Sequence, residues 1–213
     1  MPDRDTFSPL EFDAFKEIMN MGFGQAAVLL SEVMRVRTAL SVPQIRAMEP
    51  GLVRAYVEAQ LGPSPSYSMV EQFFFGKFAG RSFLLMPEDQ CRRLGAVFAD
   101  AAMPSGEELE LGSLERDMVM EIGNIIIGAC VGRIAELLGD QVGFQPPRYL
   151  PSPLDLGNIG AGPGESGDLA LLFRTVFHFK EEDIEGQLFL VASHESIAWL
   201  KEAVRRYIAS LAP

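Results

Sequence analysis

The sequence predicts an α+β fold in which one plan (helix, strand, variable segment, hairpin, helix) is used twice. Two observations carry this prediction. The motif Asp-x3-Glu-x2-Asn-x22-Pro occurs twice in the 213 residues, and each position of the second copy lies 104 residues after its counterpart. The segment GRSFLLMPED at 80–89 also matches GQLFLVASHE at 186–195. Because internal repeats are a primary fold signal, we expect one domain over 1–213, built of a first repeat at 9–112 and a second at 113–210.

The first half begins with a helix, since apolar residues recur at helical spacing from Pro9 to about Arg35. A strand is expected at 38–45, closed by Pro43, because proline cannot donate to a sheet ladder. Weak alternation of apolar residues at 52–61 indicates a second strand. The residues expected on the core face of the helix are Phe15, Ile18, Gly22, Ala26, Leu29 and Val33.

A hairpin and a helix complete the first half. Its strands are expected at 70–78 and 81–86, joined by a glycine-containing turn. Pro87 then opens a helix that runs to about residue 101, because proline suits the first helical turn and two acidic residues follow it there. A polar connection at 103–112 leads to the second half.

The second half is expected to follow the same order. Its predicted elements are a helix at 113–138, a strand at 141–144 ended by Pro146-Pro147, a glycine-rich loop at 154–167, a hairpin of 169–179 with 186–192, and a last helix at 193–210. The core face expected for the first of these helices consists of Val119, Ile122, Ile126, Cys130 and Leu137.

The composition excludes several function classes. Hydrophobic residues make up 48% and charged residues 22%, as in ordinary globular proteins. The net charge of −11 argues against nucleic acid and anionic membranes as partners, because both favour clustered Lys and Arg. No segment has the apolar core of a signal peptide, and no window approaches about 18 uninterrupted apolar residues. We therefore expect a cytoplasmic protein that is not inserted in a membrane.

The duplicated motif places two carboxylates and an amide at i, i+4 and i+7, on the helix face opposite the core. The first copy consists of Asp13, Glu17, Asn20 and Pro43, and the second of Asp117, Glu121, Asn124 and Pro147. A single polar helix face is most simply a solvated surface. Here, however, the three polar residues are identical between copies while core positions differ, as in Phe15 against Val119. Identity at freely variable surface positions suggests a function.

Glu and Asn on one helix face suit a specific role in phosphoryl chemistry. An amide donates and accepts hydrogen bonds but does not titrate usefully, so Asn is a poor base. It can hold a water molecule in line for attack on phosphorus, as a Gln does in GTPases. The Glu can pair with a cation on a partner and fix the approach of the helix. The metal and the phosphoryl group then belong to the partner.

Other candidate sites are weaker. The loop at 154–167 is not followed by the helix that a phosphate-binding loop requires. His178 and His194 have no companions at ligand spacing, and Cys91 and Cys130 belong to no CxxC or Cys/His cluster. No GxSxG or HExxH motif occurs. We therefore predict no metal or cofactor site of the chain's own.

The segment Glu121-Ile-Gly-Asn124-Ile, its second copy and the helix-to-hairpin plan resemble the CheC family of bacterial chemotaxis response-regulator phosphatases, which is related to CheX and FliY. The resemblance covers about residues 9–209, and two motif copies favour CheC over CheX, which has one. It implies two pseudo-twofold halves that share a continuous antiparallel sheet flanked by helices, with the motif helices on one outer side.

The resemblance also implies a function. The chain would be a hydrolase, a protein aspartyl-phosphate phosphatase that dephosphorylates a phosphorylated CheY-type response regulator and tunes chemotaxis signalling. The regulator carries its own Mg²⁺, and the receptor deamidase CheD is a candidate second partner. The alternative is a non-catalytic adaptor that binds phosphorylated regulator or CheD. The roles that the resemblance implies are water positioning for Asn20 and Asn124, contact with a regulator lysine for Glu17 and Glu121, support for Asp13 and Asp117, and a structural role for Pro43 and Pro147.

The first copy departs from the family pattern at Met19, where the family favours glycine. Met19 is adjacent to Asn20 in sequence, so it would either crowd a docked regulator or contact it. The second copy has the family's glycine in the equivalent place. We therefore expect the second site to be the stronger.

Overall fold

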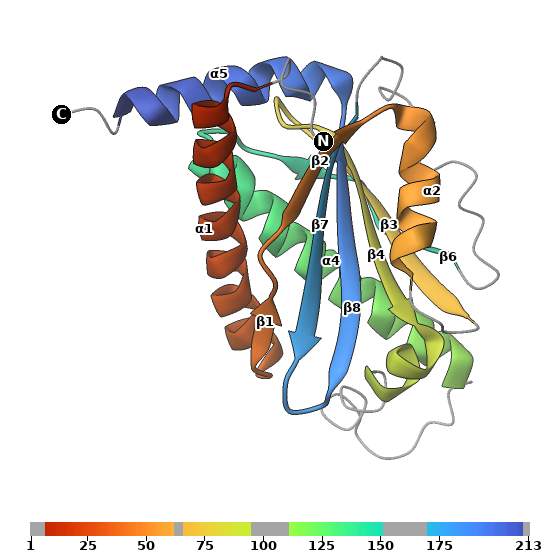
Figure 1. The fold of residues 1–213 in the computed structure, drawn as a ribbon. Coiled ribbons are helices and arrows are strands. Elements are labelled where there is room, and N and C mark those ends of the chain that lie inside the picture. Colours follow the sequence, from red (N-terminus) through yellow and green to blue (C-terminus); the bar gives the residue numbers. More distant parts are fainter. Residues whose placement is uncertain (1–6, 62–65, 95–110, 151–169, 211–213) are drawn as a thin grey trace.

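A single antiparallel sheet carries the other elements (Figure 1). The computed structural model describes residues 7–61, 66–94, 111–150 and 170–210. Along the chain the strands and helices are α1 Pro9–Met34, β1 Thr38–Leu40, β2 Gln44–Met48, α2 Pro50–Gln60, β3 Tyr67–Phe75, β4 Gly80–Pro87, α4 Leu111–Leu137, β5 Gly143–Phe144, β6 Arg148–Leu150, β7 Ala170–Phe179, β8 Ile184–Ala192 and α5 His194–Ser210. The predicted α+β class with an antiparallel sheet is confirmed.

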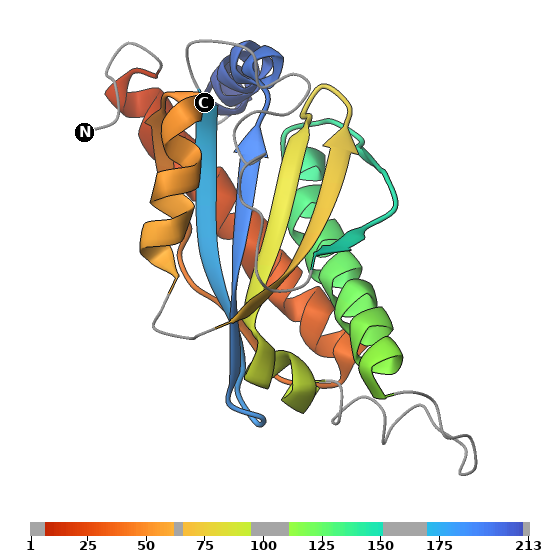
Figure 2. The same cartoon turned by 90° about the vertical axis from the view of Figure 1, so that its right-hand side faces the viewer.

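The helices cover the sheet unequally. On one face α1, α4 and α5 pack over the main hydrophobic core, which includes Phe15, Ile126 and Phe173 (Figure 2). The other face is covered by α2 over a smaller cluster, which includes Val53 and Phe83. Burial of these apolar side chains is the main stabilising term of such a layered fold.

The strand order is β1-β7-β8-β4-β3-β5, and β2 also pairs with β7 while β6 also pairs with β3. Strands β8 and β4 lie in the centre. If each strand is matched with its counterpart in the other predicted repeat (β1 with β5, β7 with β3, β8 with β4), the order is the same from either edge. Strands β1 and β2 come from the first predicted repeat but pair with β7 of the second, and β5 and β6 pair with β3 of the first. Each repeat therefore completes the sheet of the other, while the duplication itself stays a prediction.

The strand expected at 52–61 is wrong, because these residues belong to helix α2. Proline at its first turn favours a helical start. Val53 and Val57 are fully buried at a helical spacing of four, and Arg54 pairs with Glu58 across the same spacing at 2.8 Å. Packing on the second sheet face thus overrides the weak alternation in the sequence.

The strand expected at 38–45 is interrupted rather than closed by its proline. Pro43 lies between β1 and β2, and Pro147 lies between β5 and β6. The short strand β6 differs from the expectation, in which Pro146-Pro147 ends the strand at 141–144. In both places the chain makes a break in the ladder and then pairs again with the same neighbour. The predicted loop at 154–167 lies outside the described residues.

The buried stripe of each long helix winds around its axis. In α1 it follows Gly22, Ala26, Leu30 and Met34, and in α4 it follows Ile126, Cys130, Ile134 and Leu138 as the helix ends. This four-residue spacing is typical of helices whose ridges interdigitate as they cross. It also explains two corrections to the expected core faces: Val33 is 53% exposed and Leu29 is only half-buried, while Leu138 takes the buried position expected for Leu137.

One helix of the described chain, over Arg116–Leu137, is long and apolar enough by composition to cross a membrane, and 56% of the window concerned is buried inside the protein. A core helix passes the same test, so this is weak evidence of a span. Its apolar character is used in the core, since Ile126, Cys130 and Ile134 are fully buried.

Glu11 ties the start of α1 to α5. It forms a capping box with Ser8, and its Oε1 accepts a 2.6 Å hydrogen bond from Nε of Arg205. The backbone N–H of Ser8, followed by the Arg205 side chain, lowers the pKa of Glu11 from 4.5 to about 2. A lowered pKa means that the folded state favours the ionised carboxylate.

We expect Glu11→Gln to lower the free energy of unfolding at pH 7, because Gln keeps the capping box but loses the charged contact. Since the folded pKa is the lower one, the wild-type advantage is complete above about pH 5. It is lost as the pH falls from 4.5 towards 2. Urea unfolding of wild type and E11Q between pH 2 and pH 7 measures this difference in the free energy of unfolding. Glu58→Gln, which breaks an exposed pair, is the control and should cost about 0.5 kcal/mol or less. Equal stability of E11Q and wild type at pH 7 would contradict the expectation.

Candidate functional site

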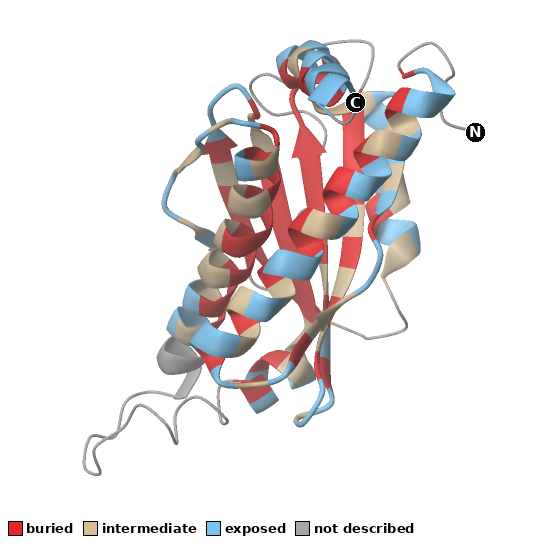
Figure 3. Ribbon diagram, turned by 90° about the vertical axis from the view of Figure 1, so that its left-hand side faces the viewer, coloured by how far each residue is buried: buried red, intermediate tan, exposed pale blue. Residues whose placement is uncertain are grey.

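The two motifs lie on the outward faces of α1 and α4, on the same side of the sheet (Figure 3). Asp13, Glu17 and Asn20 are exposed on α1. On α4, Asp117 and Glu121 are exposed, while Asn124 is half-buried. Each helix therefore presents a carboxylate one turn before an amide, on a rigid element whose opposite face is fixed in the core.

The second carboxylate of each motif is available to a partner. Neither Glu17 nor Glu121 makes a hydrogen bond or ion pair with any described residue. Asp13 differs, since its Oδ1 accepts from Nζ of Lys16 at 3.2 Å, with side chains 73% and 50% exposed. An exposed pair of this kind contributes little to stability.

The two asparagines have different surroundings. Oδ1 of Asn124 accepts a 2.8 Å hydrogen bond from Nε2 of Gln72 on β3. The same Nε2 donates to the backbone carbonyl of Gln145 at 3.0 Å. In contrast, the side chain of Asn20 has no hydrogen bond to the part of the chain that the structure describes. The second site is thus partly built into the protein, and the first is a free amide on the surface.

Thr175 on β7 corresponds to Gln72 on β3, because their hairpin partners Leu188 and Ser82 hold the same position in the matching segments 186–195 and 80–89. Its side chain is shorter than that of Gln72. Oγ1 of Thr175 on β7 donates to the carbonyl of Ser41 at 2.8 Å. Ser41 and Gln145 are 104 residues apart, so each is the residue two before the proline of its motif. The hydroxyl of Thr175 thus binds the carbonyl that corresponds to the one Gln72 binds, and it makes no hydrogen bond to Asn20.

Sequence reasoning missed Gln72. The signal was present, because strand alternation places Gln72 in line with Val70 and Phe74 on the core face. A neutral amide at such a position is uncommon and calls for a partner. The partner on α4 could not be deduced without the packing of helix on sheet.

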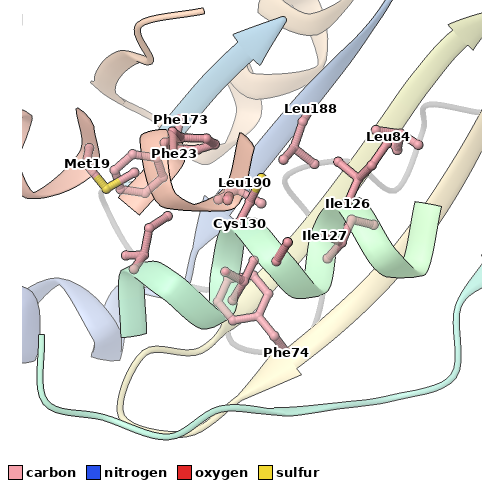
Figure 4. Packing of buried hydrophobic residues seen from close by; sticks show 14 of the residues in the cluster. Met19, Phe23, Phe74, Leu84, Ile126, Ile127, Cys130, Phe173, Leu188 and Leu190 are labelled. Carbon is pink, nitrogen blue, oxygen red and sulfur yellow. The ribbon is translucent and has the colours of Figure 1, made fainter. Parts of the chain in front are cut away.

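Met19 does not lie on the docking face. It is fully buried in the main core (Figure 4), so the expectation that it would crowd or contact a docked regulator is wrong. The residue next to Asn20 is turned by about 100° around the helix, which points Met19 at the sheet. The stated reason for a stronger second site therefore fails, and the ordering of the sites stays a prediction.

Glycine at the equivalent place in α4 has a packing role. A methyl group added at Gly123 would lie 2.9 to 3.0 Å from the side chain of Val70 on β3. Contacts this short do not occur without a shift of the neighbour. Gly123 therefore lets α4 approach β3 closely, and this approach brings Asn124 within reach of Gln72.

A groove adjoins the N-terminal part of each motif helix. The groove beside α1 has a volume of about 440 Å³ and is lined by residues that include Phe12, Lys16 and Pro43. The groove beside α4 has a volume of about 250 Å³ and is lined by residues that include Arg116 and Tyr149. In the first groove Lys16 pairs with Asp13, whereas in the second Arg116 lies over the ring of Tyr149.

The remaining candidates stay outside this arrangement. Within 7–61, 66–94, 111–150 and 170–210, no group of three or more His, Cys, Asp and Glu side chains is placed to hold a metal ion. Nε2 of His178 lies 3.3 Å from Oδ1 of Asp183 across the hairpin turn. Cys130 is fully buried, and desolvation raises the pKa of its thiol.

Comparisons with known proteins agree with the predicted fold. No family model matches the chain. It is 23% identical over 151 residues to the flagellar motor switch phosphatase FliY of Bacillus subtilis, covering 70% of this chain and 37% of that protein. It is 23% identical over 177 residues to the putative CheY-P phosphatase CheC1 of Halobacterium salinarum, covering 81% of this chain and 85% of the relative.

The chain thus spans little more than a third of its FliY relative from Bacillus subtilis. Among solved structures, Thermotoga maritima FliY superposes with a TM-score of 0.63 at 20% identity, covering 94% of this chain and 98% of the other. The sequence relatives and this shared fold come from one group of proteins. In sequence the chain is similar to FliY and CheC proteins, and it shares the fold of Thermotoga maritima FliY.

Proposed function

We propose that the chain is a phosphatase that hydrolyses the aspartyl phosphate of a CheY-type response regulator. The observation that carries the proposal is the pair of outward-facing Glu/Asn ridges on α1 and α4, in which Glu17 and Glu121 are exposed and have no hydrogen bond or ion pair with a described residue. The names of the relatives, a flagellar motor switch phosphatase FliY and a putative CheY-P phosphatase CheC1, support the same reaction class. The adaptor alternative is decided by the first experiment below.

The proposed chemistry needs positioning rather than a strong base. A water oxygen attacks phosphorus, the bond between phosphorus and the aspartyl oxygen breaks, and the regulator's carboxylate leaves as a stable anion. The proton of the water passes to the phosphate that is released. Asn20 or Asn124 would bind this water through its amide and hold it in line. Placing a reactant in line contributes several kcal/mol to a barrier in favourable cases.

The carboxylates of Glu17 and Glu121 would fix the helix against the regulator. An exposed carboxylate one turn before the amide can pair with a lysine on the partner, which sets the angle at which Asn enters the site. The resemblance assigns Mg²⁺ to the regulator, and we keep that assignment as part of the proposal. The cytoplasm as location, chemotaxis as pathway and CheD as a second partner likewise stay proposals.

We expect Asn20→Ala and Asn124→Ala each to leave partial activity, and the double variant to leave none. Without the amide the water has no fixed position, so phosphate loss returns to the regulator's own rate. The measurement is the decay of a CheY-type regulator phosphorylated with acetyl phosphate. Gln25→Ala, which removes an exposed amide of α1 outside the motif, is the control. If wild type binds the phosphorylated regulator without accelerating its decay, the phosphatase proposal fails and the adaptor replaces it.

We expect Glu17→Gln combined with Glu121→Gln to raise KM for phosphorylated regulator by about fivefold, because an exposed ion pair contributes about 1 kcal/mol. The kcat should change little, since neither carboxylate takes part in bond making. The effect should also shrink as salt is raised from 50 to 500 mM, because salt screens exposed charges. Steady-state kinetics at several salt concentrations measures this, and a loss confined to kcat would contradict the docking role.

A further inference from the structure

We propose that Gln72 is a positioning residue for Asn124, which it holds in one orientation before any partner binds. This inference rests on the proposed function, because it assigns a task to Asn124. It predicts that the two motif sites differ in kind: the second is preordered and the first becomes ordered only on docking. The observations that carry it are the hydrogen bonds of Gln72, its burial, and the different residue at the matching position.

The chemistry of three groups fixes the orientation of the Asn124 amide. The backbone carbonyl of Gln145 can only accept hydrogen bonds, so the atom of Gln72 that faces it must be the donor Nε2. This nitrogen carries two hydrogens, and the second is directed at Asn124 over 2.8 Å. The atom of Asn124 that receives it must be the acceptor Oδ1. The Nδ2 end of Asn124 is consequently left for a bound partner.

Burial makes this arrangement rigid. The side chain of Gln72 is 1% exposed, and β3 holds it between β4 and the short strands β5 and β6. A fully buried side chain in a paired strand has few alternative rotamers. Asn124 therefore spends less conformational entropy on reaching its working orientation than a free surface amide does.

Gln72 is also costly to the fold. Its Oε1 is buried without a hydrogen-bond partner in the described structure. An unsatisfied buried acceptor costs about 1 to 3 kcal/mol, and an apolar side chain of the same length avoids that cost. A polar residue at a position where stability favours an apolar one is the pattern expected of a functional constraint. The two hydrogen bonds that Nε2 of Gln72 donates account for the polar residue at this position.

The first motif site lacks this device. Thr175 occupies the matching position on β7, and its hydroxyl is used on the carbonyl of Ser41. Asn20 is exposed and has no hydrogen bond to a described residue. Met19 stands where α4 has Gly123, and a long buried side chain there fills the space between helix and sheet. The first amide can be oriented only by the regulator itself.

The test is Gln72→Met, which keeps the length of the side chain but removes the donor. It is made in the N20A background, where Asn124 works alone, and in the N124A background, where Asn20 works alone. We expect kcat for phosphorylated CheY-type regulator to fall by about tenfold in the first background. KM should stay the same there, and the second background should be unchanged. The matched control is Thr175→Val, which removes the corresponding hydrogen bond in the other half and should slow neither site selectively.

An independent readout does not require activity. In the uniformly ¹⁵N-labelled chain, Gln72→Met should shift the side-chain amide signals of Asn124 and increase their mobility, and leave those of Asn20 in place. Unchanged Asn124 signals would overturn the proposal. So would an equal loss of kcat in both backgrounds, which would indicate general damage to the fold. If the wild type shows no phosphatase activity, the proposed function fails, and the amide signals alone decide whether Gln72 positions Asn124.

Discussion

The crossing of α1 over α4 sets the position of both motifs. Gly22 marks this contact, because a methyl group added there would lie 3.1 Å from Cγ1 of Ile134. The four-residue stripes on the two helices meet at the crossing and turn the opposite faces outward. The direction in which each Glu/Asn pair points is thus a consequence of helix packing. A side chain on a packed helix is held more precisely than one on a loop, which suits a site that works by positioning.

The strand exchange in the sheet places a strand of each half beside the motif of the other half. Gln72 belongs to the first predicted repeat, and Asn124, which it contacts, belongs to the second. Thr175 of the second repeat in turn binds the carbonyl of Ser41 in the first. Each motif is therefore supported by a strand from the other half.

Much of this arrangement was predictable from the sequence, for identifiable reasons. The long helices and the hairpins have strong periodicity, and the motif spacing alone placed Glu17 and Asn20 on an outward face. Helix α2 was not predictable. The spacing of four between Val53 and Val57 indicates a buried helix face only once it is known that the second face of the sheet needs cover. Met19 was misplaced because adjacency to Asn20 in sequence is not adjacency on a helix surface. The contact of Gln72 with Asn124 depends on how closely Gly123 allows α4 to approach β3, and no local pattern encodes that distance.

The strand exchange also bears on how the chain is made. Strands β1 and β2 near the N-terminus have their partner in β7, which is more than a hundred residues further along. Contacts this distant in sequence close late and slow folding. During synthesis Glu17 and Asn20 leave the ribosome long before β7, the strand with which β1 and β2 pair. The motif on α1 cannot have its strand support until β7 has been synthesised, whereas Gln72 and Gln145, which hold Asn124, both precede β7 in the chain.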